Sequence, residues 1–305
     1  MATTFGGTNA VTVSNADAFI PEIWADEIVA AYKKNLVAAN LIKKMSHRGK
    51  KGDTVHIPSP TRGNASLKVA ANTVTLIANT DSDIPVSINK HYEYSRLIED
   101  FAEVQALSSL RRFYTDDAGY ALATRIDTSL IELGRGAQAG SGTAAYNKAY
   151  LAGDGSTLYV DGTNIGTALT DAGLRRAIQR LDDSDVPMDG RFLIVPPATR
   201  NTMMGLARFT EQAFVGDGGT IRNGQIGDVY GVKVFVTTNA DTATTTTTRV
   251  ALLAHPEAFV LVDQLGVRVQ TQYKQEYLGT LLTADTLYGV GELRDTSAVA
   301  LAVPA

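Results

Sequence analysis

The sequence predicts an α+β protein built from a long β-arm, a very long helix, a small α/β section and closing strands. The arm is the first observation behind this prediction: Val55 and Ile57 alternate with polar neighbours, as do Ile84 and Val86, which is the period of a half-buried strand. Between these runs, residues 61–82 are mostly polar or small. Because an isolated two-stranded ribbon is only marginally stable in water, the arm must be covered by another part of the chain or by another chain.

The second observation is an apolar stripe at helical spacing that runs from Val104 to Leu133, over about eight turns. No proline occurs between Pro85 and Pro187. A helix from Glu99 to Leu133 would be about 50 Å long. A compact chain of this length has a radius of gyration of about 19 Å, so the helix would cross the whole molecule as a spine. Acidic residues at its start are expected to stabilise the helix dipole: Glu99, Asp100 and Glu103.

The third observation is a compact α/β section after the spine. Thr170 is expected to cap a helix, with Leu169 and Leu174 as its hydrophobic staple. A buried strand is expected at 191–195, stopped by two prolines, and a second helix at 199–207. Further strands are expected at 231–236, 250–253, 258–262, 267–272, 288–293 and 298–303. The small, polar stretch 136–166 is expected to form surface loops and a hairpin.

The N-terminal region combines a helical pattern at 20–42 with a basic run that lacks any acidic residue between Glu27 and Asp53. The run comprises Lys33, Lys34, Lys43, Lys44, Arg48, Lys50 and Lys51. Two interpretations stay open for it: a solvated face, or an electrostatic contact with nucleic acid, an acidic scaffold or an acidic neighbour. The net charge of −4 excludes a chain that coats nucleic acid along its whole length.

Composition limits the function classes further. The 305 residues are 44% hydrophobic and 20% charged, as in ordinary globular proteins. The absence of cysteine excludes disulfide frameworks, thiolate metal sites and cysteine nucleophiles, and it fits a reducing compartment. No secretory signal is expected in the first sixteen residues, and no stretch has the length of a membrane span.

No catalytic constellation is evident in the sequence. The four histidines are scattered, and neither a phosphate-binding loop nor a hydrolase nucleophile elbow is present. Asp182, Asp183 and Asp185 could bind a divalent cation or supply an acid/base pair, but their place at a helix end before Pro187 favours a solvated turn. We therefore predict no catalytic residue, no metal ligand and no cofactor.

Two local motifs and the order of the parts point to a known family. Residues 191–197 (RFLIVPP), followed by a helix, are similar to that family's strand–proline–helix step. Residues 224–234 (GQIGDVYGVKV) are similar to its G-x-I-G-x-x-x-G-V-x-V run before a strand, and 287–289 (LYG) matches a late tripeptide of some members. Over nearly its whole length, the chain resembles the major capsid proteins of tailed double-stranded DNA bacteriophages, whose fold is named after phage Hong Kong 97.

The resemblance implies a division of the chain into five parts. These are an N-terminal arm and helix (1–47), the extended β-arm or E-loop (48–95), a peripheral domain with the spine helix (96–165), an axial domain (166–262) and closing strands that return to the peripheral domain (263–305).

The resemblance also implies a structural, non-enzymatic protein that self-assembles into hexamers and pentamers of an icosahedral shell enclosing phage DNA. Expected partners are copies of itself, a scaffolding protein, a portal, packaged double-stranded DNA and, as an optional partner, decoration proteins, with no membrane. A separate scaffolding protein is expected because the β-arm begins too early for a scaffolding domain before it. Assembly is expected in the host cytoplasm, and the product in the virion.

In such a shell the arm would lie across a neighbouring subunit and pair charges with it. The candidate donors are Lys50, Lys51, Arg62 and Lys68, and the candidate acceptors are Glu99, Asp100 and Glu103. Two alternatives stay open. One is an encapsulin-type shell that holds protein cargo, and the other is an α/β enzyme that uses Asp182 and Asp185.

Overall fold

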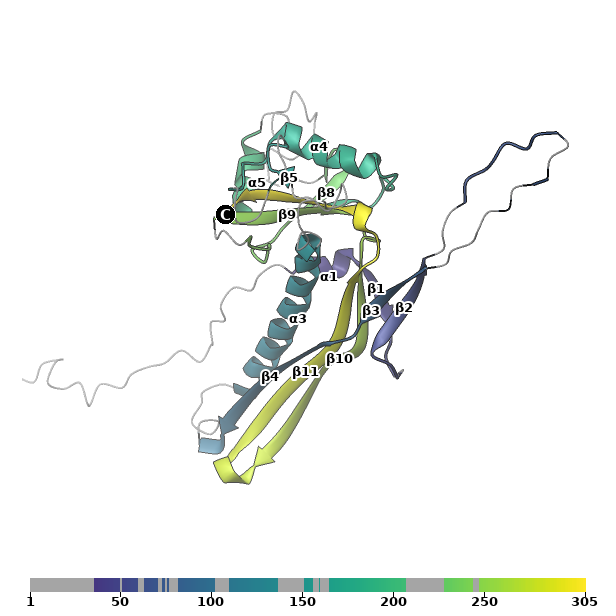
Figure 1. Cartoon of the computed structure of the whole chain (residues 1–305). Helices are drawn as coiled ribbons and strands as arrows, with labels where there is room; N and C mark the ends of the chain where they lie inside the picture. The colour runs from purple at the N-terminus through teal and green to yellow at the C-terminus, as the bar shows by residue number, and fades with distance from the viewer. Residues whose placement is uncertain are drawn as a thin grey trace, which may run out of the picture.

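A computed structural model describes residues 36–49, 51–59, 63–70, 73–74, 76, 82–101, 110–136, 151–155, 159, 165–206, 228–243 and 247–305. Three predicted contact residues, Lys50, Arg62 and Glu103, lie outside these ranges, as does most of the predicted helix 20–42. The described chain forms two units, each built on one sheet, and an arm that projects from between them (Figure 1).

The first unit is a four-stranded sheet in the order β1–β10–β11–β4, with helix α3 against one face (Figure 1). Its elements are β1 (Lys43–Ser46), β4 (Lys90–Glu99), α3 (Leu110–Gly136), β10 (Phe259–Lys274) and β11 (Gly279–Glu292), and the short 3-10 turn Gln275–Tyr277 joins the last two strands. The apolar side chains on one face of β4 pack against the apolar stripe of α3. In this core, Tyr92 and Tyr94 of β4 contact Ala118 and Leu122 of α3.

The predicted spine helix is confirmed, but its start is different. Strand β4 continues to Glu99, which pairs with Gly279 of β11, and Ile98 is buried. Within the described ranges, helix α3 spans Leu110–Gly136, which is 27 residues or about 40 Å. The prediction that Glu99 opens the helix was wrong, because pairing with β11 keeps the chain extended through a segment that would otherwise suit a helix start. Asp100 is the first helical residue after β4.

The second unit is a six-stranded sheet in the order β5–β12–β9–β6–β8–β7. Its elements are β5 (Leu151–Ala152), α4 (Asp171–Asp182), β6 (Phe192–Val195), α5 (Pro197–Met204), β7 (Asp228–Val229), β8 (Val232–Val236), β9 (Thr248–Ala254) and β12 (Ala298–Pro304), the last preceded by the 3-10 turn Asp295–Ser297. The predicted start of α4 is confirmed: the Thr170 hydroxyl accepts a hydrogen bond of 3.1 Å from the Gly173 N–H, and Leu169 and Leu174 share one core.

The closing strands differ from the predicted set. The expected strands 258–262 and 267–272 are one strand, β10, with register shifts on either side of Leu265. Strand β11 starts at Gly279, well before the expected 288, because pairing on both sides keeps the threonine- and leucine-rich stretch 279–287 extended. Strand β12 pairs with β9 in the second sheet and so does not lie with β10 and β11. Strand β5, predicted as surface, is buried beside β12.

The N-terminal end of the described chain also differs from expectation. Helix α1 has only four residues, Ala38–Leu41, and Lys43 already belongs to β1. Strand β1 runs parallel to the start of β10, where Lys43 is opposite Val260. The expected helix to residue 42 therefore gives way to a strand, because the exposed edge of β10 offers the chain backbone hydrogen-bonding partners.

The arm begins as a two-stranded hairpin of β2 and β3, in which Val55 is opposite Val86 and Ile57 is opposite Ile84. Its strands are β2 (Thr54–Ser59) and β3 (Ser82–Ser87). Val86 and Ile88 are buried against the first residues of β10. The base of the arm is therefore covered by its own chain. Residues 60–81, which we call the arm tip, extend beyond the last strand pair.

One apolar core joins the two units. Phe192 and Leu252 of the second sheet pack with Leu130 of α3 and with Phe259 and Tyr288 of the first sheet. The Tyr288 hydroxyl lies 3.0 Å from the Ser129 hydroxyl, and burial raises the pKa of Tyr288 to about 12. The arm thus projects from a continuous, packed body.

Candidate assembly surfaces

The root of the arm is held by a β-bulge in β10. The His47 N–H donates to the Asp263 carbonyl at 2.8 Å, and the Gln264 side-chain amide donates to the Gly52 carbonyl at 2.9 Å. The Arg48 guanidinium forms an ion pair with the Asp263 carboxylate, with Nε donating at 2.9 Å. Bulges typically re-aim neighbouring groups. Here the bulged residues face the chain where it leaves β1 and enters the arm.

Gly266 completes this arm-root socket, which comprises Arg48, Asp263, Gln264 and Gly266. A Cβ atom on Gly266 would lie 2.6 Å from Nη2 of Arg48, so only glycine leaves the guanidinium in place. Next to the socket is a cavity of about 510 Å³. It is lined mainly by β1 and β10, with Ala39 from α1, Ile126 from α3, and Thr286 and Tyr288 from β11.

Gly266→Ala should therefore loosen the arm root without unfolding the subunit. The arginine can move away, and an ion pair as exposed as this one contributes about 0–1 kcal/mol, so we expect little change in melting temperature. Amide hydrogen exchange at residues 47–52 should become faster, and shell yield should fall. Gly119→Ala is the matched control, because no heavy atom lies within 4 Å of its added Cβ. Unchanged exchange at the root in Gly266→Ala would contradict a positioning role for the socket.

The arm tip contains the apolar side chains with the highest exposed fractions in the described arm. The fractional exposures of Leu67 and Leu76 are 91% and 88%, and those of Val69 and Val74 are 54% and 68%. Scattered exposed apolar residues are ordinary, but several on one extended segment are typical of an interaction site. The part of the chain that the structure describes does not cover them.

The predicted charge partners lie far apart in the subunit. Lys51 is exposed at the arm root and Lys68 on the arm tip, whereas Glu99 and Asp100 are at the opposite end of the sheet (Figure 1). Asp100 accepts a hydrogen bond of 2.8 Å from the Tyr273 hydroxyl, which raises the pKa of that tyrosine. The four of these residues that the structure describes, Lys51, Lys68, Glu99 and Asp100, are therefore not brought together within one chain.

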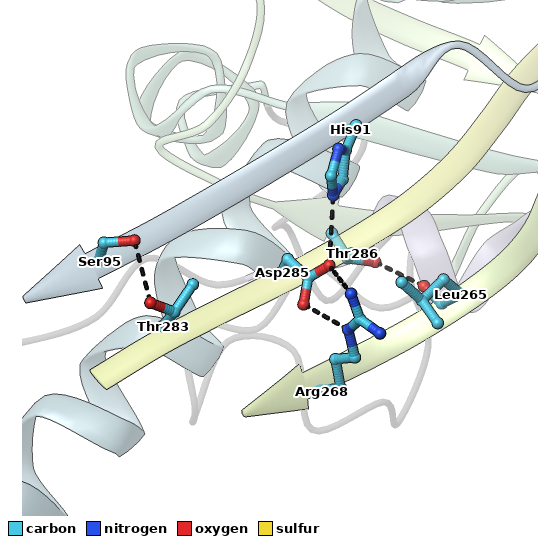
Figure 2. Close-up of polar contacts among 7 residues, drawn as sticks. All are labelled: His91, Ser95, Leu265, Arg268, Thr283, Asp285 and Thr286. Atoms are coloured by element: carbon cyan, nitrogen blue, oxygen red, sulfur yellow. Dashed lines mark hydrogen bonds and ion pairs between the residues drawn. The ribbon is translucent and has the colours of Figure 1, made fainter. Parts of the chain in front are cut away.

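A charged cluster braces the sheet on the face opposite α3 (Figure 2). Arg268 of β10 donates from Nε and Nη2 to the two carboxylate oxygens of Asp285 on β11, at 2.7 and 2.9 Å. His91 Nε2 of β4 lies 3.2 Å from the same carboxylate. The hydrogen bond from Arg268 lowers the pKa of Asp285, burial opposes this, and His91 adds to the lowering.

A carboxyl whose folded pKa is lowered stabilises the fold above its unfolded value, and this contribution is lost as the pH falls through the folded pKa. Asp285→Asn should thus lower the neutral-pH melting temperature of the subunit by roughly 2–4 °C. The difference from the unmodified chain should shrink below about pH 4. Thermal melts from pH 7 to pH 3 check this, with Asp116→Asn on the exposed face of α3 as control. A constant difference across that range would show that the carboxyl's charge is not involved.

A buried carboxylate connects the two units where α1 meets the spine. Asp127 of α3 is fully buried, and its two oxygens accept from the Ala38 N–H at 2.7 Å and from the Asn239 side-chain amide at 3.1 Å. The same amide donates to the Thr128 hydroxyl at 3.0 Å. Asn239 follows β8 of the second sheet. Asp127 therefore joins the N-terminal segment, the spine and the second sheet in one hydrogen-bond network.

The acidic residues considered as an enzyme site have a structural role instead. Asp182 ends α4 and pairs at 2.7 Å with Arg191, whose side chain is 3% exposed. Asp185 sits in the following turn with a positive φ of 54°. The predicted solvated turn is thus confirmed in position, with Asp182 neutralising a buried guanidinium. Among the described residues, no group of three or more histidine or acidic side chains could hold a metal ion.

Several contact residues were missed by sequence reasoning: Asp127, Asp263, Gly266 and Asp285. A glycine inside a strand pattern indicates a bulge, so Gly266 carried a readable signal. Asp127 and Asp285 carried no such signal, because the sequence does not show whether a single carboxylate lies on a solvated face or is covered by another element. No helix of the described residues is both long and apolar enough to cross a membrane.

Solved capsid structures of low sequence identity share this fold over almost the whole chain. One, described as Mycobacterium phage Che8, is 23% identical, with 93% of this chain and 97% of that chain covered and a TM-score of 0.73. The capsid structure of the cyanophage P-SCSP1u is 18% identical, with coverages of 98% and 97% and a TM-score of 0.77. The mature capsid of bacteriophage PhiM1 is 15% identical, with both coverages 99% and a TM-score of 0.72.

These similarities confirm the Hong Kong 97-like fold predicted from the motifs. No curated protein sequence matches the chain. A family model described as phage capsid protein matches residues 94–301. This match includes β4 from its fifth residue, the spine, both helices of the second unit and most of the closing strands. Because it spans more than half of the 305 residues, the chain belongs to the phage capsid protein family and is a structural protein of the capsid shell.

Proposed function

We propose that this chain is the major capsid subunit, which forms the hexamers and pentamers of an icosahedral shell around packaged double-stranded DNA. The observation that carries the proposal is the arm: its root is held by the arm-root socket, while its tip exposes Leu67 and Leu76 almost completely. A subunit that anchors the root of an apolar segment and covers so little of its tip has a surface that another chain can complete. Many such contacts repeated under closed symmetry produce a stable shell from weak interactions.

The two units suggest different places in that shell. We assign the six-stranded unit to the axial domain, around the centre of each hexamer or pentamer, and the four-stranded sheet with α3 to the peripheral domain. The four-stranded unit is elongated, and the arm tip and the end of β4 lie at opposite ends of it (Figure 1). This shape supports contacts to more than one neighbour.

The predicted charge pairing belongs to contacts between subunits. The arm donors Lys50, Lys51, Arg62 and Lys68 would meet Glu99, Asp100 and Glu103 of a neighbour. The separation of Lys68 from Glu99 within one chain supports a partner from another chain, because an arm that reaches away from its own acceptors is available to a neighbour's.

Reversing the charge at the arm root tests this pairing. Lys50→Glu together with Lys51→Glu should lower shell yield and weaken its dependence on salt, because charge pairs at the surface are screened over about 10 Å at 0.1 M salt. Lys233→Glu, which reverses one charge on an exposed strand residue of the second sheet, is the control, and the single variant Lys51→Glu is compared with it. Light scattering during assembly at several salt concentrations measures both effects. Assembly with unchanged yield and salt dependence in the double variant would refute the pairing.

The remaining partners follow from the same proposal: a separate scaffolding protein, a portal, decoration proteins as an optional addition, and assembly in the host cytoplasm before the product enters the virion. We propose no enzymatic activity and no cofactor. The family match favours this reading over an α/β enzyme and over an encapsulin-type shell.

Electron microscopy of the purified protein tests the function directly. A capsid subunit is expected to give closed particles in the megadalton range, whereas an enzyme would remain a monomer or small oligomer whose melting temperature responds to a ligand. Nucleic acid inside particles isolated from infected cells supports the phage shell. Protein cargo without nucleic acid would support the encapsulin alternative instead.

A further inference from the structure

The four-stranded sheet has two free edges that differ in chemistry. One is β4, whose ten residues include four charged side chains: Lys90, Glu93, Arg96 and Glu99. The other is the outer edge of β10 over residues 267–274, since β1 pairs only with Val260–Asp263 and no further strand within the described ranges pairs there. Charged side chains protect an edge against pairing with other chains. The β4 edge has that protection.

The β10 edge does not have it. Over residues 267–274, the side chains are valine, glutamine, threonine and tyrosine with two charges, Arg268 and, at the last residue of the strand, Lys274. Figure 2 shows Arg268 turned across the sheet toward Asp285, where both of its hydrogen bonds end. An extended, unpaired edge with so little charge is a ready template for another strand.

Apolar side chains of β10 lie uncovered next to this edge, on the side of α3. Val269 is opposite Ala284, which packs against α3, so the two side chains share that face. Yet α3 does not cover β10 there: the exposures of Val267, Val269 and Tyr273 are 47%, 42% and 49%. We call these three residues the β10 strip. Its upper end opens into the 510 Å³ cavity, which Val267 lines.

The described part of the arm tip fits this edge by its pattern. Residues 63–69 belong to no helix and have no strand partner in the described chain, and Leu67 and Val69 are separated by one residue. In a strand these two side chains would point to one side and Lys68 to the other. Strand β10 alternates in the same way: Val267 and Val269 point to the side of α3, and Arg268 and Gln270 point to the opposite side.

We propose that residues 63–69 of a second copy of this chain add to the β10 edge as a fifth strand, with Leu67 and Val69 over the β10 strip. This proposal rests on the proposed function and specifies where the arm of one subunit binds the neighbouring subunit. The register follows from charge: Lys68 would be repelled directly opposite Arg268, so it lies opposite Gln270. Leu67 and Val69 are then opposite Val269 and Thr271.

Disulfide trapping tests this contact between subunits. Because the chain has no native cysteine, only the introduced cysteines can form a disulfide. Lys68→Cys combined with Gln270→Cys should form a disulfide between chains on mild oxidation of assembled shells, because directly opposite residues have Cα atoms within about 7 Å. Gln272→Cys in place of Gln270→Cys covers a register shift of two residues. The control pairs Lys68→Cys with Ser95→Cys on β4, which is the opposite edge of the sheet, two strands from β10 and out of reach.

Covalent dimers with a partner cysteine at 270 or 272, and none at 95, are the expected result. Shells that form without a cross-link at 270 or 272, or that cross-link equally at 95, overturn the proposal and leave the capsid function intact. If the unmodified chain forms no shell at all, the proposed function itself fails, so the two failures are distinguishable.

A second variant decides the question without cysteines. Val269→Lys places a charge in the β10 strip at a position already 42% exposed, so the free subunit should melt within a few degrees of the unmodified chain. Shell yield should fall by about tenfold or more, since each shell repeats the contact many times. Ser95→Lys, on the opposite face of the same sheet, should assemble normally. A normal yield for Val269→Lys would overturn the proposal.

Discussion

Replacing the arm tip, residues 60–81, with an Asn-Gly turn should abolish shell assembly while the subunit stays folded. The hairpin can be closed in this way because Ser59 and Ser82 are directly opposite each other in the last pair of β2 and β3, and Asn-Gly suits a two-residue hairpin loop. The described side chains of the tip bury almost nothing in the subunit, so their removal should not change the free energy of unfolding appreciably.

Sedimentation and electron microscopy measure the loss of shells, and a thermal melt of the free subunit measures its stability. The matched variant keeps the full arm and changes only Leu67→Ser and Val69→Ser. It should lower shell yield with an unchanged melting temperature, which separates the apolar contact from the length of the arm. Full-yield shells from the shortened chain would show that the arm tip is not an assembly surface.

Asp127→Ala should give the largest loss of subunit stability among these variants. It leaves the Ala38 N–H and one N–H of the Asn239 amide buried without an acceptor, and each unsatisfied group costs about 1–3 kcal/mol. We expect the free energy of unfolding to fall by about 2–5 kcal/mol. Because the same carboxylate connects α1, the spine and the second sheet, the two units should also lose their common orientation, and shells should become irregular.

Urea unfolding measures this effect, with Asp116→Ala as control. Asp116 is exposed on the same helix, so its removal should change stability by no more than about 0.5 kcal/mol. A double-mutant cycle with Asn239→Ala should reveal a coupling of at least about 0.5 kcal/mol if the hydrogen bond is the cause. Equal stability of Asp127→Ala and Asp116→Ala would mean that the buried network does not hold the units together.

The motif at residues 191–197, one of the two that suggested the family, shows where local sequence is a reliable guide to structure. The strand at 192–195 forms as predicted, because a short β-branched and apolar run is buried on both faces and Pro196 ends it. The helix predicted at 199–207 also forms, but it spans Pro197–Met204, because Pro197 suits the first helical turn. The cap of α4 is likewise local: Thr170, Leu169 and Leu174 lie within five positions of one another. Such elements need no knowledge of distant residues.

Predictions that depended on distant pairing were less accurate. Glu99 does not open the spine helix as predicted, since β11, some 180 residues later in the chain, holds β4 extended to its last residue. Strand β12 was expected with β10 and β11, but it pairs with β9 because the chain crosses to the second sheet after β11. Strand pairing is a property of two segments, and the pattern of either one does not name its partner.

By itself, the sequence determined the α+β class, the arm, the spine, the absence of a catalytic constellation and the membership of a capsid family. These depend on periodicity, residue type and short motifs, which are written along one stretch of chain. Only the tertiary structure decided that the arm's base is covered by β10, that its root sits in the arm-root socket, and that one edge of the sheet is left unprotected. Each of these depends on which backbone groups and charges meet across more than a hundred residues, and a hydrogen bond or a buried carboxylate has no signature until both partners are in place.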